Sequence, residues 1–290
     1  MTRPCPGPRA TTRRPSWQPP PDSTDCHCHV FGPYDRYPLS PGRSYTPPEA
    51  SIAQYLAMLD SIGLRRTVIV QPSIYGTENA VTLDAVEAIG PDRARAVVVV
   101  DESFDAAALR AMAGRGARGV RFNAVSGNGT PLDQIERLAE RIAPLGWHLQ
   151  LYTRAEELPA LEPVLARLPV PVVLDHMGGV KTAEGGAEHP GFKALLRLLE
   201  GGNAWAKLCG YRSSSAGHPY ADVAPMARAI IAAAPDRLVW GTDWPHPSLH
   251  RPEDVPDDGH LMDLLGQWAP EPAQRRAILV DNPARLYGFG

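Results

Sequence analysis

Eight short runs rich in β-branched residues recur along the chain, and stretches whose apolar residues follow the helical period separate them. The expected strands are 24–30, 66–71, 95–100, 119–123, 148–152, 170–175, 204–208 and 238–242. The expected helices are 49–62, 79–89, 105–114, 131–143, 155–168, 190–200 and 222–234, followed after the last strand by 260–267 and 271–280. Repeated βα units with no linker between them predict an α/β fold, a (β/α)8 TIM barrel in a single domain. An open doubly wound sheet is less favoured, because it would have fewer strands and a glycine-rich phosphate-binding turn after the first one, which this sequence lacks.

The N-terminal segment, MTRPCPGPRATTRRPSWQPPP (residues 1–21), differs in composition from the rest of the chain. It is rich in proline and arginine and contains no acidic residue. Such a segment cannot continue a helix or bury much surface, so we expect an extended or flexible arm before a barrel that spans residues 22–290. The whole chain has 290 residues, and its 43% of hydrophobic residues are sufficient for a barrel core.

Charge and cysteine content narrow the possible partners. The formal net charge is −3 with basic and acidic residues interspersed, so neither a nucleic acid nor a membrane is an expected partner. No apolar run approaches the roughly 20 residues that cross a bilayer, and the N-terminus lacks the apolar core of a secretory signal, which predicts a cytoplasmic protein. Four cysteines in a chain of this size do not form a disulfide framework. A homo-oligomer is possible, because barrels of this type often assemble.

Polar residues gather where the expected strands end. The active site of a (β/α)8 barrel lies at the C-terminal ends of its strands, so residues at those ends are candidates for function. They are His27, His29, Ser73, Arg121, Asn123, Tyr152, Asp175, His176, Lys207, Arg212, Asp243 and His246. The sequence leaves open whether Lys207 points into the barrel or towards a helix.

Alternation along a strand predicts which side chains face the barrel interior. Successive residues point to opposite faces, so His27 and His29 are expected to share one face. Cys26 and Cys28 are expected to share the other, where they pack as small hydrophobic residues between the barrel and a helix. Asp175 could orient the imidazole of His176, but by the same rule it is expected to point away from the interior and to contact a helix.

Three motifs, in this order along the chain, resemble the amidohydrolase superfamily. They are the His-x-His of DCHCHVFGP (25–33), VLDHMG (173–178) and VWGTDWPHP (239–247). Further segments, VIVQPSIYGTENAVTLDA, RGVRFN, GWHLQLY and NPARLYGF, extend the resemblance over nearly the whole chain. The branch looks like the one that contains 2-pyrone-4,6-dicarboxylate lactonase and related lactone hydrolases and isomerases. The resemblance implies a (β/α)8 barrel that hydrolyses a carbon–oxygen bond, with a small anionic lactone or carboxylic acid as substrate.

The resemblance also assigns roles to individual residues. Asp243 is implied to activate water, and His27, His29 and His176 are implied to polarise the carbonyl group, directly or through a metal ion. The side chains implied to bind the substrate are Tyr45, Ser73, Arg121, Tyr152, Arg212 and His246, and for His246 the sequence leaves open that it supports Asp243 instead. These residue types fit the chemistry, because opening a lactone requires a base for the water, a hydrogen-bond donor or cation at the carbonyl oxygen, and anchors for a carboxylate. An ionised Asp243 beside neutral histidines favours an alkaline pH optimum.

The sequence allows two answers about metal. Binuclear members of the superfamily have a bridging lysine or acidic ligand after strand four and a histidine after strand five, where this chain has Asn123 and Tyr152. A binuclear centre is therefore not expected. A single zinc or manganese ion could be held by His27, His29, His176 and Asp243. The lactonase branch works without a tightly bound metal, so we expect that no cofactor is required.

One departure from the lactonase pattern concerns the substrate. Gly127 follows Arg121 by six residues, at a position where the lactonase pattern has a second basic residue. One group that binds a carboxylate is therefore missing, and the substrate is expected to differ from pyrone dicarboxylate. Lactone isomerisation and mononuclear metal-dependent decarboxylation are alternative reactions for the same site. A catalytically silent barrel that binds a small acid or a partner protein would have lost at least one of the key residues, and none is missing.

Overall fold

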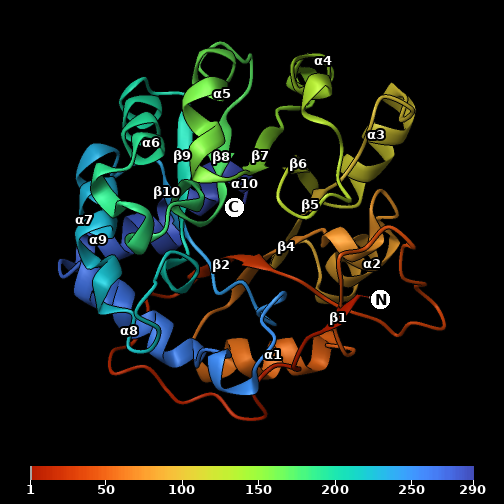
Figure 1. Cartoon of the computed structure of the whole chain (residues 1–290). Coiled ribbons are helices and arrows are strands. Elements are labelled where there is room, and N and C mark those ends of the chain that lie inside the picture. Colours follow the sequence, from red (N-terminus) through yellow and green to blue (C-terminus); the bar gives the residue numbers. More distant parts are fainter. Residues whose placement is uncertain (1) are drawn as a thin grey trace.

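Eight parallel strands form one sheet in the computed structural model, which describes residues 2–290 (Figure 1). They are β2 (Thr24–Cys28), β4 (Arg66–Val70), β5 (Ala94–Val98), β6 (Ala117–Asn123), β7 (His148–Tyr152), β8 (Val172–Leu174), β9 (Ala204–Leu208) and β10 (Leu238–Trp240). Each strand pairs with the next one along the chain. The first and last strands close the sheet, because the Asp243 amide donates to the His27 carbonyl and the His29 amide donates to the Trp244 carbonyl, both at 2.7 Å. The predicted (β/α)8 barrel is confirmed.

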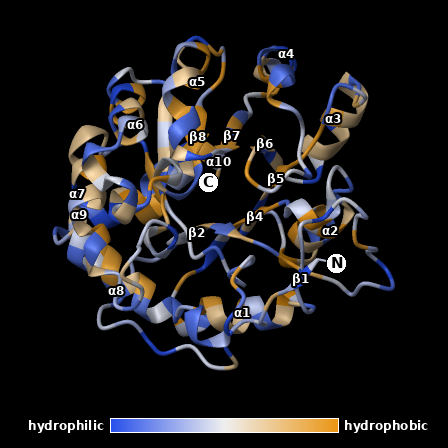
Figure 2. Cartoon of the chain, in the orientation of Figure 1, coloured by the Kyte–Doolittle hydropathy of each residue, from blue (hydrophilic) through white to orange (hydrophobic). Residues whose placement is uncertain are grey.

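Helices surround the strands (Figure 1). They are α1 (Ile52–Ser61), α2 (Ala80–Ile89), α3 (Ala106–Gly114), α4 (Ile135–Ile142), α5 (Leu158–Leu165), α6 (Pro190–Glu200), α7 (Ala224–Ala233), α8 (Asp258–Trp268), α9 (Pro272–Arg276) and α10 (Asn282–Tyr287). In Figure 2 the outer helices carry both hydrophobic and hydrophilic residues. In α4, for example, Ile135, Leu138, Ala139 and Ile142 are buried at the helical spacing, and the residues between them are charged.

The segment after α8 differs from the prediction. The helix expected over 271–280 is divided into α9 and a π-helical turn, Ala277–Asp281, and α10 then continues the segment. The sequence did not predict α10, which contains Pro283. Pro283 has no amide hydrogen to donate, and it lies at the start of α10, directly after the π-helical turn.

The N-terminal segment lies against the barrel. β1 (Arg3–Pro4) pairs in parallel with β3 (Tyr45–Thr46), which belongs to the loop after β2. Further along, Trp17 Nε1 donates to the carbonyl of Met262 in α8 at 3.2 Å. The segment therefore connects the loop after β2 with the helix after β10, across the contact between the first and last strands.

A β-bulge in β2 changes which side chains face the interior. Asp25 pairs with Thr67 and Cys28 pairs with Ile69, so β2 has one residue more than β4 in this interval. The predicted common face of Cys26 and Cys28 is wrong for this reason. Cys26 points into the barrel, and Cys28 points outward, where its Sγ lies 3.2 Å from the Thr67 hydroxyl.

The lower part of the barrel interior is apolar. Cys26 packs there with Val68, Val70, Val97, Val173, Trp205, Val239, Tyr287 and Phe289. Tyr287 and Phe289 belong to the C-terminal segment, which covers the N-terminal ends of the strands, and Arg95 Nε donates to the Tyr287 carbonyl at 3.1 Å. The opposite end of the barrel is therefore the one available for polar chemistry.

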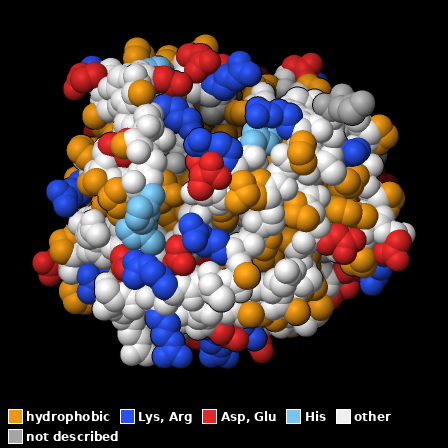
Figure 3. Space-filling view, turned by 60° about the horizontal axis from the view of Figure 1, so that its bottom comes forward, with side chains coloured by type: hydrophobic (Ala, Val, Ile, Leu, Met, Phe, Trp, Pro, Cys, Tyr) orange, Lys and Arg blue, Asp and Glu red, His pale blue; other side chains and the backbone are white. Residues whose placement is uncertain are grey.

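The surface agrees with the modest net charge of −3. On the face shown in Figure 3, basic and acidic side chains are interspersed rather than separated by sign. None of the helices within residues 2–290 combines the length and the apolar character needed to cross a bilayer.

Candidate active site

A cavity of about 160 Å³ lies at the C-terminal ends of the strands. Its walls are formed by His29, Ser44, Tyr45, Ser73, Arg121, Asn123, Val125, Ser126, Tyr152, His176, Arg212, Asp243, Pro247 and Ser248. The structure thus brings together eight of the ten residues that the sequence proposed for the site. The two others, His27 and His246, are buried close to the cavity without forming its walls.

His29 follows β2 and directs one ring nitrogen at Asp243. Nδ1 lies 2.7 Å from the Val70 carbonyl oxygen, and because a carbonyl only accepts hydrogen bonds, Nδ1 carries the proton. Burial lowers the pKa of His29, so the ring is neutral and Nε2 has a free lone pair. Nε2 lies 3.3 Å from Asp243 Oδ1. Two acceptor atoms therefore face the same point, an arrangement that suits a water molecule donating to both.

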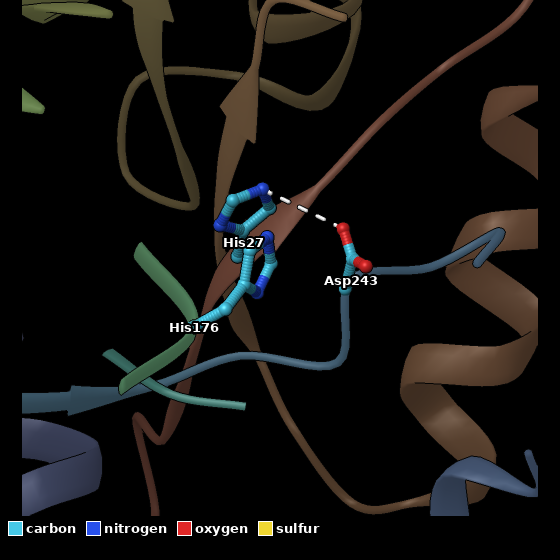
Figure 4. A group of neighbouring side chains, drawn as sticks. All are labelled: His27, His176 and Asp243. Atoms are coloured by element: carbon cyan, nitrogen blue, oxygen red, sulfur yellow. Dashed lines mark ion pairs between the residues drawn. The ribbon is translucent and has the colours of Figure 1, made fainter. Parts of the chain in front are cut away.

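His27 lies deeper than His29. Its Nδ1 is 3.3 Å from Asp175 Oδ1 and 3.4 Å from Lys207 Nζ, and its Nε2 is 3.6 Å from Asp243 Oδ1 (Figure 4). Burial lowers the pKa of His27 well below its ordinary value, and the charge of Lys207 lowers it further. The ring is therefore neutral, and its tautomer depends on whether Nδ1 donates to Asp175 or accepts from Lys207.

Asp175 lies inside the barrel, which corrects the prediction that it contacts a helix. The chain leaves β8 before Asp175, and His176 has a left-handed φ of 48°, so strand alternation does not extend to these two residues. Arg121 Nε and Gln150 Nε2 donate to Asp175 Oδ2 at 3.2 and 3.0 Å, and Lys207 Nζ lies 3.5 Å from Oδ1. Lys207 therefore points into the barrel. Burial would raise the pKa of Asp175, but the surrounding positive groups hold it well below its usual range.

Asp243, after β10, has one carboxylate oxygen bound and the other directed at the histidines. Tyr211 Oη and Arg212 Nε each donate to Oδ2 at 2.6 Å. Burial would raise the pKa of Asp243, but the charge of Arg212 holds it well below its usual range, so the side chain is a carboxylate. Tyr211 was not predicted for the site, although its position directly before Arg212 could have identified it.

Among residues 2–290, His27, His176 and Asp243 form a group that could hold one metal ion (Figure 4). Each offers one ligand atom, and these atoms lie within 4.8 Å of one another. Burial lowers the pKa of His176 to about 4, so both imidazoles offer neutral nitrogens. Nε2 of His27 and Nδ1 of His176 make no hydrogen bond within the described part of the chain, as ligand atoms require. Arg212 and Lys207, however, already place positive charge beside two of these ligands, which opposes a cation.

His246, predicted either to contact the substrate or to support Asp243, lies behind the cavity wall. Its Nε2 is 3.2 Å from Asp258 Oδ1, and its ring contacts that of Tyr211 edge to face, with 5.2 Å between the ring centroids. Tyr211 in turn donates to Asp243. His246 therefore contacts the partner of the carboxylate rather than the space where a substrate would lie.

The loop after β6 places Gly127 outside the cavity. Val125 and Ser126 form part of the wall, and the Asn123 side-chain oxygen accepts from both of their amides, at 3.2 and 3.1 Å. Gly127, with a φ of 70°, lines a neighbouring cavity. The loop contributes no basic side chain to the wall.

Neutral histidines around an ionised aspartate, at the C-terminal ends of barrel strands, are the kinds of group that water-activating hydrolases use. The sequence profile of the amidohydrolase family matches residues 24–289, and the chain belongs to this family. The predicted family is thereby confirmed.

Three relatives are similar over nearly their whole lengths. A 2-pyrone-4,6-dicarboxylate hydrolase of Comamonas testosteroni is 40% identical over 96% of this chain and 94% of its own. A 4-sulfomuconolactone hydrolase of Rhizobium radiobacter is 40% identical over 98% of this chain and 96% of its own. A D-galactarolactone isomerase of Agrobacterium fabrum is 33% identical over 91% of this chain and 90% of its own. These similarities agree with the predicted branch of the superfamily.

Proposed function

We propose that this protein hydrolyses a carboxylated lactone with a water molecule that Asp243 activates. The observation that carries the proposal is the position of Asp243 Oδ1, which is 3.3 Å from Nε2 of His29 and 3.6 Å from Nε2 of His27, while Oδ2 is fixed by two donors. A fixed, ionised carboxylate with one available oxygen is the geometry of a general base. The names of the two 40% identical hydrolases support a lactone as the bond that is opened.

The water bound by Asp243 and His29 would lose a proton to Asp243 as its oxygen attacks the carbonyl carbon. A carboxylate whose pKa lies far below its usual range is a weak base, so the base must be strengthened when the substrate binds. A substrate carboxylate bound to Arg212 would strengthen the base. It would compete with Asp243 for the charge of the guanidinium, and the pKa of Asp243 would rise. Substrate binding and base activation are therefore coupled through one side chain.

The carbonyl oxygen requires a donor as negative charge develops on it. In the tautomer in which Nδ1 of His27 accepts from Lys207 Nζ, at 3.4 Å, Nε2 carries the proton and can donate to that oxygen. The ring of His176 lies beside it, with 4.8 Å between the centroids. When the intermediate collapses, the ring oxygen of the lactone leaves, and the proton held by Asp243 is available to neutralise it.

The substrate anchors line the same cavity. Arg121 and Arg212 are the two basic residues on its walls, and a guanidinium binds a carboxylate through paired hydrogen bonds. Further donors for the ring and its substituents come from Tyr45, Ser73 and Tyr152.

No cofactor is required in this proposal. A divalent ion, where one binds, would be held by His27, His176 and Asp243, and it would polarise the carbonyl and lower the pKa of bound water. The positive charges of Arg212 and Lys207 beside these side chains support hydrolysis without metal. We therefore expect chelation to leave turnover unchanged, measured together with the metal content of the purified protein by elemental analysis.

The test is hydrolysis of a panel of carboxylated lactones, followed by acid release at constant pH and by proton NMR of the products. We expect ring opening that releases one equivalent of acid for each lactone consumed. Consumption without acid release identifies isomerisation, and release of carbon dioxide identifies decarboxylation. Either result, or no consumption of any carboxylated lactone, contradicts hydrolysis.

Lactone isomerisation is the second candidate, and the similarity to D-galactarolactone isomerase is the observation that favours it. The same base and the same arginine anchors would serve. Isomerisation also begins when a base removes a proton, either from a substrate hydroxyl that attacks the lactone carbonyl carbon or from the carbon next to that carbonyl. Acid release in the panel assay separates the two reactions.

A further inference from the structure

We propose that the N-terminal segment 3–5 is part of the active site, because it holds two loops of the cavity wall in the positions that bind the substrate. One loop follows β2 and carries Tyr45, and the other follows β10 and carries Ser248. The inference rests on the proposed function. It adds a positioning role for a segment that lies outside residues 24–289, which the family profile matches.

On one side, the segment is bound to the loop after β2. Arg3 lies beside Tyr45 in the parallel pair of β1 and β3. The Cys5 amide donates to the Thr46 carbonyl at 3.1 Å, and the hydroxyl groups of Thr2 and Thr46 share a hydrogen bond of 2.6 Å. The segment therefore gives this loop a sheet partner directly at the residue that lines the cavity.

On its other side, the segment contacts the loop after β10. His250 Nδ1 lies 3.0 Å from the Pro4 carbonyl oxygen, and because a carbonyl only accepts hydrogen bonds, Nδ1 is the donor. Burial raises the pKa of the Cys5 thiol, while the Ser248 amide and the charge of Arg212 act in the opposite direction, which places the thiol beside these two groups. One short strand thus joins the loops that follow the first and the last strand of the barrel.

Tyr45 is the side chain through which the segment affects the substrate. It is buried, and burial raises the pKa of its phenol, which therefore stays a neutral donor. The charges of Arg121, Arg212 and Asp243 all act on this phenol. The phenol therefore lies close to both the anchors of the substrate and the base.

Ser248 depends on its neighbours for a different reason. Its φ is 63°, in the left-handed region that a serine adopts only at a cost in free energy. A residue in such a conformation keeps it only where the surrounding structure holds it. The contacts of the loop after β10 with Pro4 and Cys5 are part of that surrounding structure.

The rest of the N-terminal arm is anchored independently of this segment. The amide and the hydroxyl of Ser16 donate to Asp263 Oδ1 at 2.6 and 2.7 Å, and Arg9 Nε donates to the Val255 carbonyl at 2.9 Å. Removal of residues 2–5 therefore leaves the remaining arm bound to α8 and to the loop before it.

The base does not depend on the segment either. Asp243 and His29 are held by the hydrogen bonds that join β2 to the end of β10, each 2.7 Å long. Loss of the segment is therefore expected to weaken substrate binding and to leave the chemical step unchanged. A rise in KM at nearly constant kcat is the kinetic sign of that loss.

The first experiment removes residues 2–5 and compares the truncated chain with the full chain on the best lactone of the panel. We expect KM to rise at least fivefold while kcat stays within threefold. Circular dichroism establishes that the truncated chain is folded. A smaller rise in KM, or a larger loss of kcat, overturns the inference. Either result leaves the proposed hydrolysis intact, because the full chain still opens the lactone.

The second experiment measures the same coupling in a full-length chain. Cys5 is buried and its pKa is raised, so a maleimide reacts with it only while the segment is detached. Coupling between two sites is reciprocal, so a segment that strengthens substrate binding fivefold is itself held fivefold more tightly by the substrate. We expect a saturating concentration of the lactone to slow the labelling of Cys5 at least fivefold. The measurement is mass spectrometry of the N-terminal peptide in Asp243→Asn, which keeps the lactone unconsumed.

The outcomes separate this inference from the proposed hydrolysis. Labelling that the lactone does not slow overturns the inference, even if the truncated chain fails to fold. Slower labelling, combined with no consumption of any lactone by the unmodified protein, supports the role of the segment and overturns the hydrolysis. Neither consumption nor slower labelling overturns both.

A point variant tests the contact with the loop after β10. His250→Ala removes the donor to the Pro4 carbonyl, and His218→Ala is the matched control, because the ring of His218 contacts Tyr220 and His260 instead. We expect Cys5 to be labelled about threefold faster in His250→Ala, the effect of one exposed hydrogen bond, and at an unchanged rate in His218→Ala. Equal rates in the two variants would overturn the part of the inference that joins the segment to this loop.

Discussion

The barrel interior has two layers that are built by the same strands and differ in character. β8 contributes Val173 to the lower layer, and the chain places Asp175 above it; β9 contributes Trp205 below and Lys207 above. The lower layer is apolar and stabilises the fold by burial, at roughly 25 cal/mol for each Å². The upper layer buries charges whose desolvation costs several kcal/mol for each ion. Residues that stabilise the fold and residues of the candidate site therefore lie two positions apart in the same segment. Substitutions in the two layers should affect stability and turnover separately.

The largest expected effect is on turnover, in the upper layer. Asp243→Asn removes the base and retains the shape of the side chain, so we expect kcat to fall by roughly 10²- to 10⁴-fold, the usual contribution of a positioned general base. Substrate binding should change much less, because Arg121 is unaltered. The measurement is steady-state hydrolysis of the best lactone from the panel, with circular dichroism to establish folding.

Asp84→Asn is the matched control for this variant. Asp84 is a carboxylate in α2 that also accepts from an arginine, Arg115, at 2.6 Å, but it lies on the surface. Its replacement should leave kcat within twofold. Retained turnover in folded Asp243→Asn would remove Asp243 from the role of base.

Replacing Lys207 tests the cost of the charged layer. Its Nζ donates to the Cys26 carbonyl at 2.9 Å and to Gln150 Oε1 at 2.7 Å, and Lys207→Met leaves both acceptors and part of the Asp175 charge unsatisfied. We expect the free energy of unfolding to fall by about 3 kcal/mol, measured by urea denaturation. Lys193→Met is the control, because Lys193 is exposed and its ion pair with Glu188 contributes little. Equal stability of the two variants would show that the upper layer does not depend on its lysine.

The sequence predicts the fold well because periodicity and strand ends are local signals. All eight strands and the His-x-His pair were predictable in this way. Two features were not, because they depend on tertiary geometry: the bulge in β2, which turns Cys26 inward, and the left-handed turn at His176, which turns Asp175 inward. Both errors concern the two layers of the barrel interior. Both come from applying strand alternation where the strand is interrupted or has ended.

The partners of the side chains near Asp243 were also not predictable from strand position alone. His246 lies in a motif that allowed either a substrate contact or support of Asp243, and its ring packs on Tyr211 behind the wall. Lys207 could have pointed either way, and only the closed barrel shows that it reaches Gln150 inside. Sequence position places a side chain at a strand end, whereas its partners are set by segments far away in the chain.

The lower layer should respond to substitution in stability alone. Val173→Ala removes two methyl groups from the fully buried cluster beneath the site, and we expect the free energy of unfolding to fall by about 2 kcal/mol, with kcat within twofold of the unmodified protein. Urea denaturation and steady-state kinetics measure the two quantities on the same sample. A tenfold loss of kcat in this variant would show that the layers are coupled.

The smallest expected effect is that of pH on turnover. The pKa of Asp243 lies well below its usual range. The stability that its carboxylate contributes is therefore present at neutral pH and is lost only as the pH falls below about 4. The pKa of His176 is about 4 instead of its ordinary 6.5, so the unfolded chain binds more protons between these values, and stability falls as the pH is lowered through that interval. Turnover nevertheless requires only the ionised aspartate and neutral histidines, and burial favours the neutral histidines because it lowers their pKa values.

These pKa directions replace the alkaline optimum expected from the sequence with a plateau. We expect kcat to change by less than twofold between pH 6 and pH 9, while the melting temperature decreases below pH 6.5. The pH profiles of kcat and of thermal unfolding, recorded in the same buffers, test this. An acidic limb of kcat near pH 6.5 would mean that a catalytic histidine titrates at its ordinary pKa, and that burial in the upper layer does not keep it neutral. The upper layer would then be hydrated, whereas the lower layer is not. The two layers would differ in their access to water as well as in their charge.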